Sequence, residues 1–403
     1  MSQSKASFAS DPFHGENTNT TAASHFPKTT IGFVVTVTDC GDNPDLPFPI
    51  TEGAAVLRHS IHRTSIHGTL GGKYDYRLYA VYHPNAEACV QKLSKLGYTL
   101  LKRDTPVRVE EIRGDFLREK IGENGCCGEK ELIKFEALRL TQHAAVVVLD
   151  LDVLILKPLD VLFDLILDHV HPPTNERHLQ WPDVHIPDDI WLLYTNDYAM
   201  VNPYRKLKPI QGGFVVLRPN RTIYEEIMEI VREGDYRDRG WGGVTGKFWG
   251  SMTFQGLLPY FYLIKQPGHT VELNRCLHDN MVSNPREKDI RPGKNESLCF
   301  TMEENCEDCR ERTVDEIYST HFTICQKPWL CALHANTKKS THRLCRKLHD
   351  SWFMVRSEME RAWGRSGRGM GNNTQDALGN TFAYCHGMGE KNYEFIEEPY
   401  GLW

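Results

Sequence analysis

The sequence has no excess of positive charge. Its 47 lysines and arginines stand against 53 aspartates and glutamates, which gives a formal net charge of −6 and a pI of about 6.3. Proteins that bind a nucleic acid backbone neutralise its phosphates with an excess of Lys and Arg. We therefore expect no nucleic acid partner. The sequence also contains no internal repeat.

Long apolar runs are absent as well. A membrane-spanning helix needs about 20 consecutive apolar residues, and the nearest run, 144–168, is interrupted by charged side chains. The first 28 residues are rich in Ser, Thr and Asn and have no apolar centre, so that they predict no signal peptide. We expect residues 1–29 to be disordered. If Met1 is the true start of the protein, a cytoplasmic location follows.

Cysteine, in contrast, is abundant. The chain has 12 cysteines, and this even number is high for a cytosolic enzyme. Zinc binding by Cys306 and Cys309 would need a second pair at a suitable spacing, so that disulfides are favoured, with free thiols as a third alternative. Cys126 and Cys127 are predicted to be structural or to pair with two different partners. Disulfides, together with four glycosylation sequons, slightly favour a Golgi or secretory lumen.

The most informative segment is 143–156, in which a β-branched apolar run ends in Asp150 and Asp152 before apolar residues resume. A buried strand does not carry two unpaired carboxylates at its end, because unpaired buried charge costs on the order of several kcal/mol. Side chains at positions i and i+2 of a strand point the same way, and both can reach one ion where the strand unwinds. Carboxylate oxygens suit Mg²⁺ or Mn²⁺. The alternative is that both aspartates cap the following turn.

Strand patterns alternate with helix patterns along the chain, which predicts an α/β fold with an open, mostly parallel sheet flanked by helices. Ligands of such sheets bind beyond the carboxyl ends of the strands. Besides 143–156, strands are predicted at 31–38, 76–82, 99–102, 107–109, 199–201 and 213–217. Helices are predicted at 52–66, 87–96, 129–141, 159–167, 222–232, 254–261 and 344–363, the helix at 129–141 being amphipathic.

Four sequence blocks in order resemble glycosyltransferase family 8, which includes glycogenin and galactinol synthase. They are Lys134–Thr141 leading to Asp150-Leu151-Asp152, Gln211–Val216, Gln255–Leu258, and His321-Phe322-Thr323 followed by Lys327-Pro328-Trp329. The resemblance covers roughly 31–330 and implies a GT-A-type fold. We accordingly assign 30–335 to a GT-A domain with a charged, Cys-containing insertion at 285–315, and 336–403 to a C-terminal helix and irregular tail.

The resemblance implies a role for each matched residue. Asp150, Asp152 and His321 would hold the metal ion, Mn²⁺ or Mg²⁺, in a mixed oxygen and imidazole site. Gln255, Lys327 and Asp152 would be catalytic, with Lys327 acting as a point charge on the diphosphate. The residues expected to bind the nucleotide sugar are Thr36, Thr38, Lys134, Asp150, Leu151, Gln211, Gly212, Gly213, Asn280 and Lys327.

Three positions depart from the family pattern. Phe254 stands where the family has an acid, Gln211 replaces an asparagine, and the glycine of the closing motif is replaced around 324–325. Because Phe254 removes one candidate nucleophile, we favour front-face substitution, in which the departing phosphate takes the proton of the acceptor hydroxyl.

The resemblance, together with the aspartate pair, implies a metal-dependent, retaining, glycogenin-like hexosyltransferase. Its partners would be a UDP-sugar donor and a hydroxyl acceptor on a carbohydrate, a protein or a small molecule, and a homodimer is compatible with the sequence. The basic residues of the helix at 344–363 could face anionic lipid, but a solvated face is the better interpretation. One alternative function is a catalytically silent nucleotide-sugar-binding protein, and another is a secreted structural protein held by disulfides.

Overall fold

The computed structural model describes residues 29–41, 49–173, 176–181, 183–288, 297–331, 340–365, 384–386 and 389–396. The disordered segment predicted at 1–29 therefore lies outside the described residues, except for its last position. Within the described part of the chain, no helix is both long and apolar enough to cross a membrane.

Seven strands form the central sheet, in the order β10-β6-β7-β4-β1-β2-β3. All neighbours pair in parallel except β7, which runs antiparallel between β4 and β6. The predicted open, mostly parallel sheet is thus confirmed. The strands are β1 (Thr30–Val37), β2 (Asp75–Tyr82), β3 (Thr99–Lys102), β4 (Val146–Leu149), β6 (Leu192–Asn196), β7 (Ile210–Leu217) and β10 (Thr270–Glu272).

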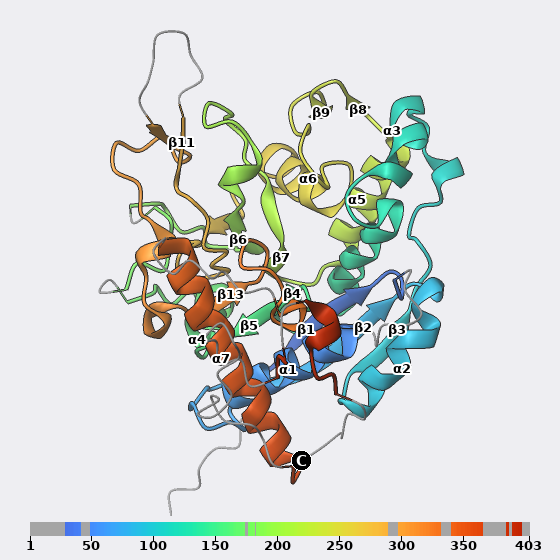
Figure 1. Cartoon of the computed structure of the whole chain (residues 1–403). Coiled ribbons are helices and arrows are strands. Elements are labelled where there is room, and N and C mark those ends of the chain that lie inside the picture. The colour runs from blue at the N-terminus through green and yellow to red at the C-terminus, as the bar shows by residue number, and fades with distance from the viewer. Residues whose placement is uncertain are drawn as a thin grey trace, which may run out of the picture.

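Both faces of the sheet are covered, because successive side chains of each strand point to opposite sides. In β1, Phe33 and Val35 enter one apolar core and Val34 enters the other. Figure 1 shows α1 and α7 on one side of the sheet and α5 and α6 on the other. The α-helices are α1 (Pro49–Arg63), α2 (Glu87–Lys95), α3 (Asp115–Lys120), α4 (Asp160–Asp168), α5 (Arg221–Glu233), α6 (Phe254–Pro259) and α7 (Ser340–Ala362).

Short elements complete the described part of the chain. The remaining strands are β5 (Val153–Ile155), β8 (Tyr236–Arg237), β9 (Gly240–Trp241), β11 (Arg286–Lys288), β12 (Ser297–Cys299) and β13 (Ser319–His321). The 3-10 segments are η1 (Pro84–Ala86), η2 (Val109–Glu111), η3 (Ile121–Glu123), η4 (Gly128–Arg139), η5 (Tyr198–Met200), η7 (Cys309–Glu311), η8 (Val314–Glu316), η9 (Pro328–Leu330) and η10 (Glu390–Asn392), and a π-helical segment is η6 (Tyr260–Lys265).

Two predicted strands are wrong. Residues 107–109 enter the short helix η2, and 199–201 overlap the short helix η5. The strand near 199–201 is β6, which lies upstream of the predicted residues. It is buried along its whole length between β7 and β10. A fully buried strand shows no alternation of apolar and polar residues, and the periodicity of the sequence therefore missed it.

The helix predicted at 129–141 is a 3-10 helix, η4, and it is not amphipathic. Every residue from Glu131 to Leu138 is buried. The reason is that η4 lies between β1, β2 and β4 on one side and α5 and α6 on the other. Polar residues of η4 are consequently held inside the protein, at the end of the sheet where the candidate site lies.

All twelve cysteines form disulfides, which confirms the preference for disulfides over zinc or free thiols. Cys306 bonds to Cys299 and Cys309 bonds to Cys276, so that the two cysteines weighed as zinc ligands have separate disulfide partners. The other pairs are Cys40–Cys89, Cys126–Cys127, Cys325–Cys345 and Cys331–Cys385. Six disulfides are typical of an oxidising compartment.

Candidate active site

The two aspartates lie where the chain leaves the sheet. β4 ends at Leu149, and the backbone turns over Asp150 and Leu151 so that the amide of Val153 donates to the Asp150 carbonyl at 3.2 Å. The amide of Asp150 donates to the carbonyl of Gly213 in β7, at 3.0 Å. The turn allows Asp150 and Asp152 to approach one point, as the sequence predicts for a strand that unwinds.

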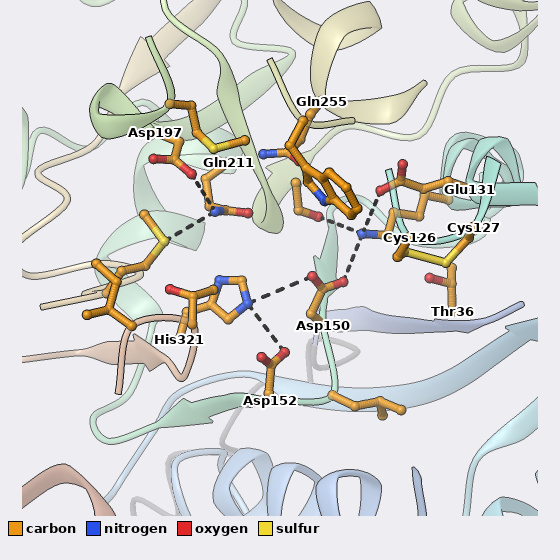
Figure 2. Close-up of a pocket in the computed structure, with 18 of the residues that line it drawn as sticks. Thr36, Cys126, Cys127, Glu131, Asp150, Asp152, Asp197, Gln211, Gln255 and His321 are labelled. Carbon is orange, nitrogen blue, oxygen red and sulfur yellow. Dashed lines mark hydrogen bonds and ion pairs between the residues drawn. A yellow bond between two sulfur atoms is a disulfide. The ribbon is translucent and has the colours of Figure 1, made fainter. Parts of the chain in front are cut away.

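The antiparallel pair β5–β13 brings His321 to these acids. Val153 pairs with His321, and the amide of Phe322 donates to the Asp152 carbonyl at 2.9 Å. The Nε2 atom of His321 is 3.3 Å from Asp152 Oδ1 and 3.8 Å from Asp150 Oδ2. One ligand atom of each residue lies within 4.8 Å of those of the other two. Figure 2 shows the imidazole facing both carboxylates.

A third acid, Asp279, lies behind the imidazole. Its Oδ1 atom is 3.3 Å from His321 Nδ1, on the ring edge opposite the other two acids. Burial by itself would lower the pKa of His321, but the charges of Asp152 and Asp279 raise it well above its usual value. Likewise, burial would raise the pKa of Asp152, but the charges of His321 and Lys327 hold it well below its usual value. An acid on Nδ1 leaves Nε2 directed at the pair, as in carboxylate–histidine–metal triads.

Two lysines neutralise the acids. Lys134 of η4 places its Nζ atom 2.8 Å from Asp150 Oδ1 and also donates to the Gly212 carbonyl at 3.3 Å. Burial would lower the pKa of Lys134, but Asp150 and Glu131 raise it above its usual value. Lys327 approaches Asp152 Oδ2 to 2.5 Å, and about a third of its side chain remains exposed. Lys134 is thus enclosed by acceptors, whereas Lys327 can also meet a ligand.

A cavity of about 580 Å³ opens above the acids, beyond the carboxyl ends of β1 and β4. All but two of the predicted site residues line it, and Figure 2 shows several of them around the hollow. Those residues are Thr36, Thr38, Lys134, Asp150, Leu151, Asp152, Gln211, Gly212, Gln255, His321 and Lys327.

The two exceptions are Gly213 and Asn280. Gly213 lies under the site, where an added Cβ atom would overlap the His321 ring and come within 2.9 Å of Asp150 Oδ2. Asn280 is fully buried away from the cavity lining. Its amide group donates to the carbonyls of Cys276 and Cys309, and its Oδ1 atom accepts from the backbone of Val282. The expectation that Asn280 binds the nucleotide sugar therefore needs correction, because its side chain is used to hold the backbone.

Gln211 connects β7 to an acid that the sequence analysis missed. Its Oε1 atom accepts from the Gly213 amide at 2.9 Å, and its Nε2 atom donates to Asp197 Oδ2 at 3.2 Å. Asp197 lines the cavity, and burial, assisted by the charge of Asp279, raises its pKa to about 6. Asp197 directly follows β6, so that recognising β6 as a strand would have revealed it by the same strand-end reasoning as for Asp150.

Other residues of the cavity lining lie in segments in which the sequence analysis found no motif. Cys126 and Cys127 form a disulfide with each other in the cavity wall, which corrects the expectation of two different partners. Glu131 also lines the cavity and accepts from the Thr253 hydroxyl. Trp249 reaches the cavity with 62% of its surface exposed, so that it does not belong to either core. Only the pairing of distant segments places these groups at the site.

Gly213→Ala is expected to lower Mn²⁺ affinity by about 10- to 100-fold, the effect seen when the groups that orient a metal ligand are disturbed. The added methyl group occupies the space of the His321 ring, which must then move away from Asp150. Titration of Mn²⁺ followed by calorimetry measures this without any substrate. Gly122→Ala is the matched control, because the nearest atom to its added Cβ, Glu129 Oε2, is 3.5 Å away. Equal Mn²⁺ affinities for the two variants would contradict the expectation.

Comparison with known proteins gives structural neighbours only. No family model matches the sequence, and no curated protein matches it. The galactosyltransferase LgtC, solved with donor and acceptor sugar analogues, is similar at 12% identity and a TM-score of 0.45, over 79% of this chain and 95% of that one. Mouse xyloside xylosyltransferase 1 is similar at 14% identity and a TM-score of 0.37, over 62% and 87%. The glycosyltransferase GlyE of Streptococcus pneumoniae TIGR4 is similar at 11% and 0.39, over 84% and 63%.

Proposed function

We propose that this protein is a GT-A-type, metal-dependent glycosyltransferase of the family 8 kind that moves a hexose from a UDP-sugar to a hydroxyl acceptor with retention of configuration. One observation carries the proposal. Asp150 and Asp152 follow β4, His321 comes from β13 far downstream in the sequence, and the three side chains converge at the carboxyl end of the sheet, on the floor of a large cavity. Nucleotide ligands of open α/β sheets bind at such an edge.

The three residues fit a divalent cation. Ligand atoms that share a Mg²⁺ or Mn²⁺ ion at about 2.1 Å stand roughly 3 to 4 Å apart. The His321 nitrogen stands 3.3 and 3.8 Å from oxygens of the two aspartates. Two carboxylates and one imidazole favour Mn²⁺ over Ca²⁺, which takes oxygen ligands only. When bound, such an ion would neutralise charge that develops on the departing diphosphate.

The surrounding residues bind and orient the donor in this proposal. Thr36 and Thr38, at the end of β1, contact the base or the ribose. Lys327 provides the exposed positive charge beside Asp152, and we assign it to the diphosphate. Lys134 is enclosed by acceptors, so that we assign it to holding Asp150 in place.

The chemistry that we favour needs no protein nucleophile. The bond between the anomeric carbon and the phosphate oxygen breaks, the acceptor oxygen bonds to the same face of that carbon, and its proton passes to the departing phosphate. Phe254 supports this route, because it is fully buried against Phe135 at a ring separation of 4.7 Å and offers no carboxylate. Gln255, the next residue, turns its side chain into the cavity and would hold a sugar hydroxyl.

The alternative is a silent protein that binds the nucleotide sugar without turning it over, and Phe254 is the feature that favours it. Incubation of the purified protein with Mn²⁺ and each of several UDP-sugars separates the two functions. Release of UDP from one donor, abolished by a chelator and restored by Mn²⁺, is the expected result. Calorimetric binding of a donor with no UDP release from any of them would support the silent protein. If no nucleotide sugar binds, both proposed functions are contradicted.

A further inference from the structure

A second hollow, of about 790 Å³, lies next to the cavity of the candidate active site. Two loops form parts of both walls. One places Met200 in the active-site cavity and Asn202 in the second hollow, and the other places Trp249 in the first and Lys247 in the second. The residues that line the second hollow, which we call the basic–apolar surface, are Asn202, Tyr204, Arg205, Lys206, Leu207, Arg239, Gly243, Val244, Lys247 and Ile264.

The charges of the basic–apolar surface have one sign. Arg205, Lys206, Arg239 and Lys247 line it, and no acidic residue does, although the chain as a whole is acidic. Arg205 is partly buried and donates to the carbonyl of Gly246 at 2.8 Å. Within the described ranges, no ion pair joins the other three cations to a carboxylate. Their charge is therefore available to an anionic partner.

The same surface exposes large apolar side chains. Val244 is 47% exposed, Ile264 44% and Tyr204 38%, and Trp249 at the border with the active-site cavity is 62% exposed. A soluble polyanion would leave these side chains in water. An anionic bilayer accommodates both features, since apolar and aromatic side chains enter the interface while Lys and Arg meet the lipid phosphates.

We infer that the basic–apolar surface docks the protein on an anionic lipid bilayer. Docking would place the mouth of the active-site cavity at the level of the lipid head groups. If the proposed function holds, the acceptor hydroxyl then belongs to a molecule held in or on the membrane. The docking itself depends only on the surface and not on sugar transfer.

Co-sedimentation of the full chain with vesicles tests the inference. We expect binding to phosphatidylcholine vesicles that contain about 30% phosphatidylserine, weakening as salt rises from about 0.1 to 0.5 M, and no binding to pure phosphatidylcholine. Replacing Lys206 and Arg239 by Gln and Lys247 by Asn should weaken the partition on the order of 100-fold. Asn is chosen at Lys247 because the backbone there is left-handed, with φ of 61°.

Two further variants test whether the apolar side chains contribute to vesicle binding and whether the loss of any three positive charges would weaken it. Replacing Val244 and Ile264 by Ser should weaken the partition about 5- to 10-fold. The matched control replaces by Gln three exposed lysines on α2 and β11, namely Lys92, Lys95 and Lys288, and should bind vesicles as the wild type does. Thermal unfolding checks that each variant is folded.

Two outcomes would overturn the inference. The first is equal vesicle binding by the charge variant and its control. The second is vesicle binding that survives the Ser substitutions unchanged while soluble polyglutamate competes fully, which would identify a binding site for a soluble acidic polymer. UDP release in solution is measured separately, so that failure of docking and failure of the proposed transfer are distinguishable.

Discussion

Asp152→Asn is expected to lower Mn²⁺-dependent release of UDP from the donor by at least 10²- to 10³-fold, the effect of removing one charged group that stabilises a developing charge. The substitution removes a carboxylate from the predicted metal group and leaves Lys327 without its partner at 2.5 Å. It preserves the size of the side chain, so that the packing of the turn before β5 changes little. The measurement is the initial rate of UDP release at saturating Mn²⁺.

The control for this variant is Asp189→Asn, because Asp189 is exposed and lies outside the cavity lining. It should release UDP at the wild-type rate. Calorimetric titration with Mn²⁺ shows whether the lost rate comes from lost metal binding. A variant at position 152 that keeps both Mn²⁺ affinity and the rate would remove Asp152 from the site and leave the proposed metal centre without support.

Arg356→Ala is expected to lower the free energy of unfolding by about 3 to 5 kcal/mol, the usual cost of breaking a buried ion pair from one side. Arg356 of α7 is 1% exposed and pairs with Glu52 of α1 at 3.2 Å and with Glu360 at 3.3 Å. Its guanidinium also stacks on the rings of Tyr384 and Tyr393. The substitution leaves two buried acids without their cation.

Urea unfolding with the disulfides intact measures this cost. Arg361→Ala is the matched control, since Arg361 is an exposed arginine near the end of the same helix, and its effect should stay within about 0.5 kcal/mol. A loss below about 1 kcal/mol for Arg356→Ala would mean that water or a rearranged partner already compensates Glu52 in the folded protein.

The two aspartates at the base of the candidate site could be predicted from the local sequence. Asp150 and Asp152 stand out because carboxylates end an apolar β-branched run, and that conflict requires a positive partner whatever the rest of the chain does. Asp197 escaped prediction, although it also follows a strand, because β6 is buried on both faces and has no periodic pattern. Asn280 was predicted to face the ligand and instead holds backbone carbonyls, since nothing local indicates where an amide group points.

The amino-acid sequence alone determined the α/β class and the strand that carries the acids, and it favoured disulfides over zinc or free thiols for the cysteines. The fold class and the strand follow from patterns of neighbouring residues, and the preference for disulfides follows from the number of cysteines. Only the tertiary structure decided that Asp279 supports His321 and that cationic and apolar side chains gather beside the cavity. Such contacts join residues of different segments, and strand register and helix packing, which no local pattern records, bring those segments together.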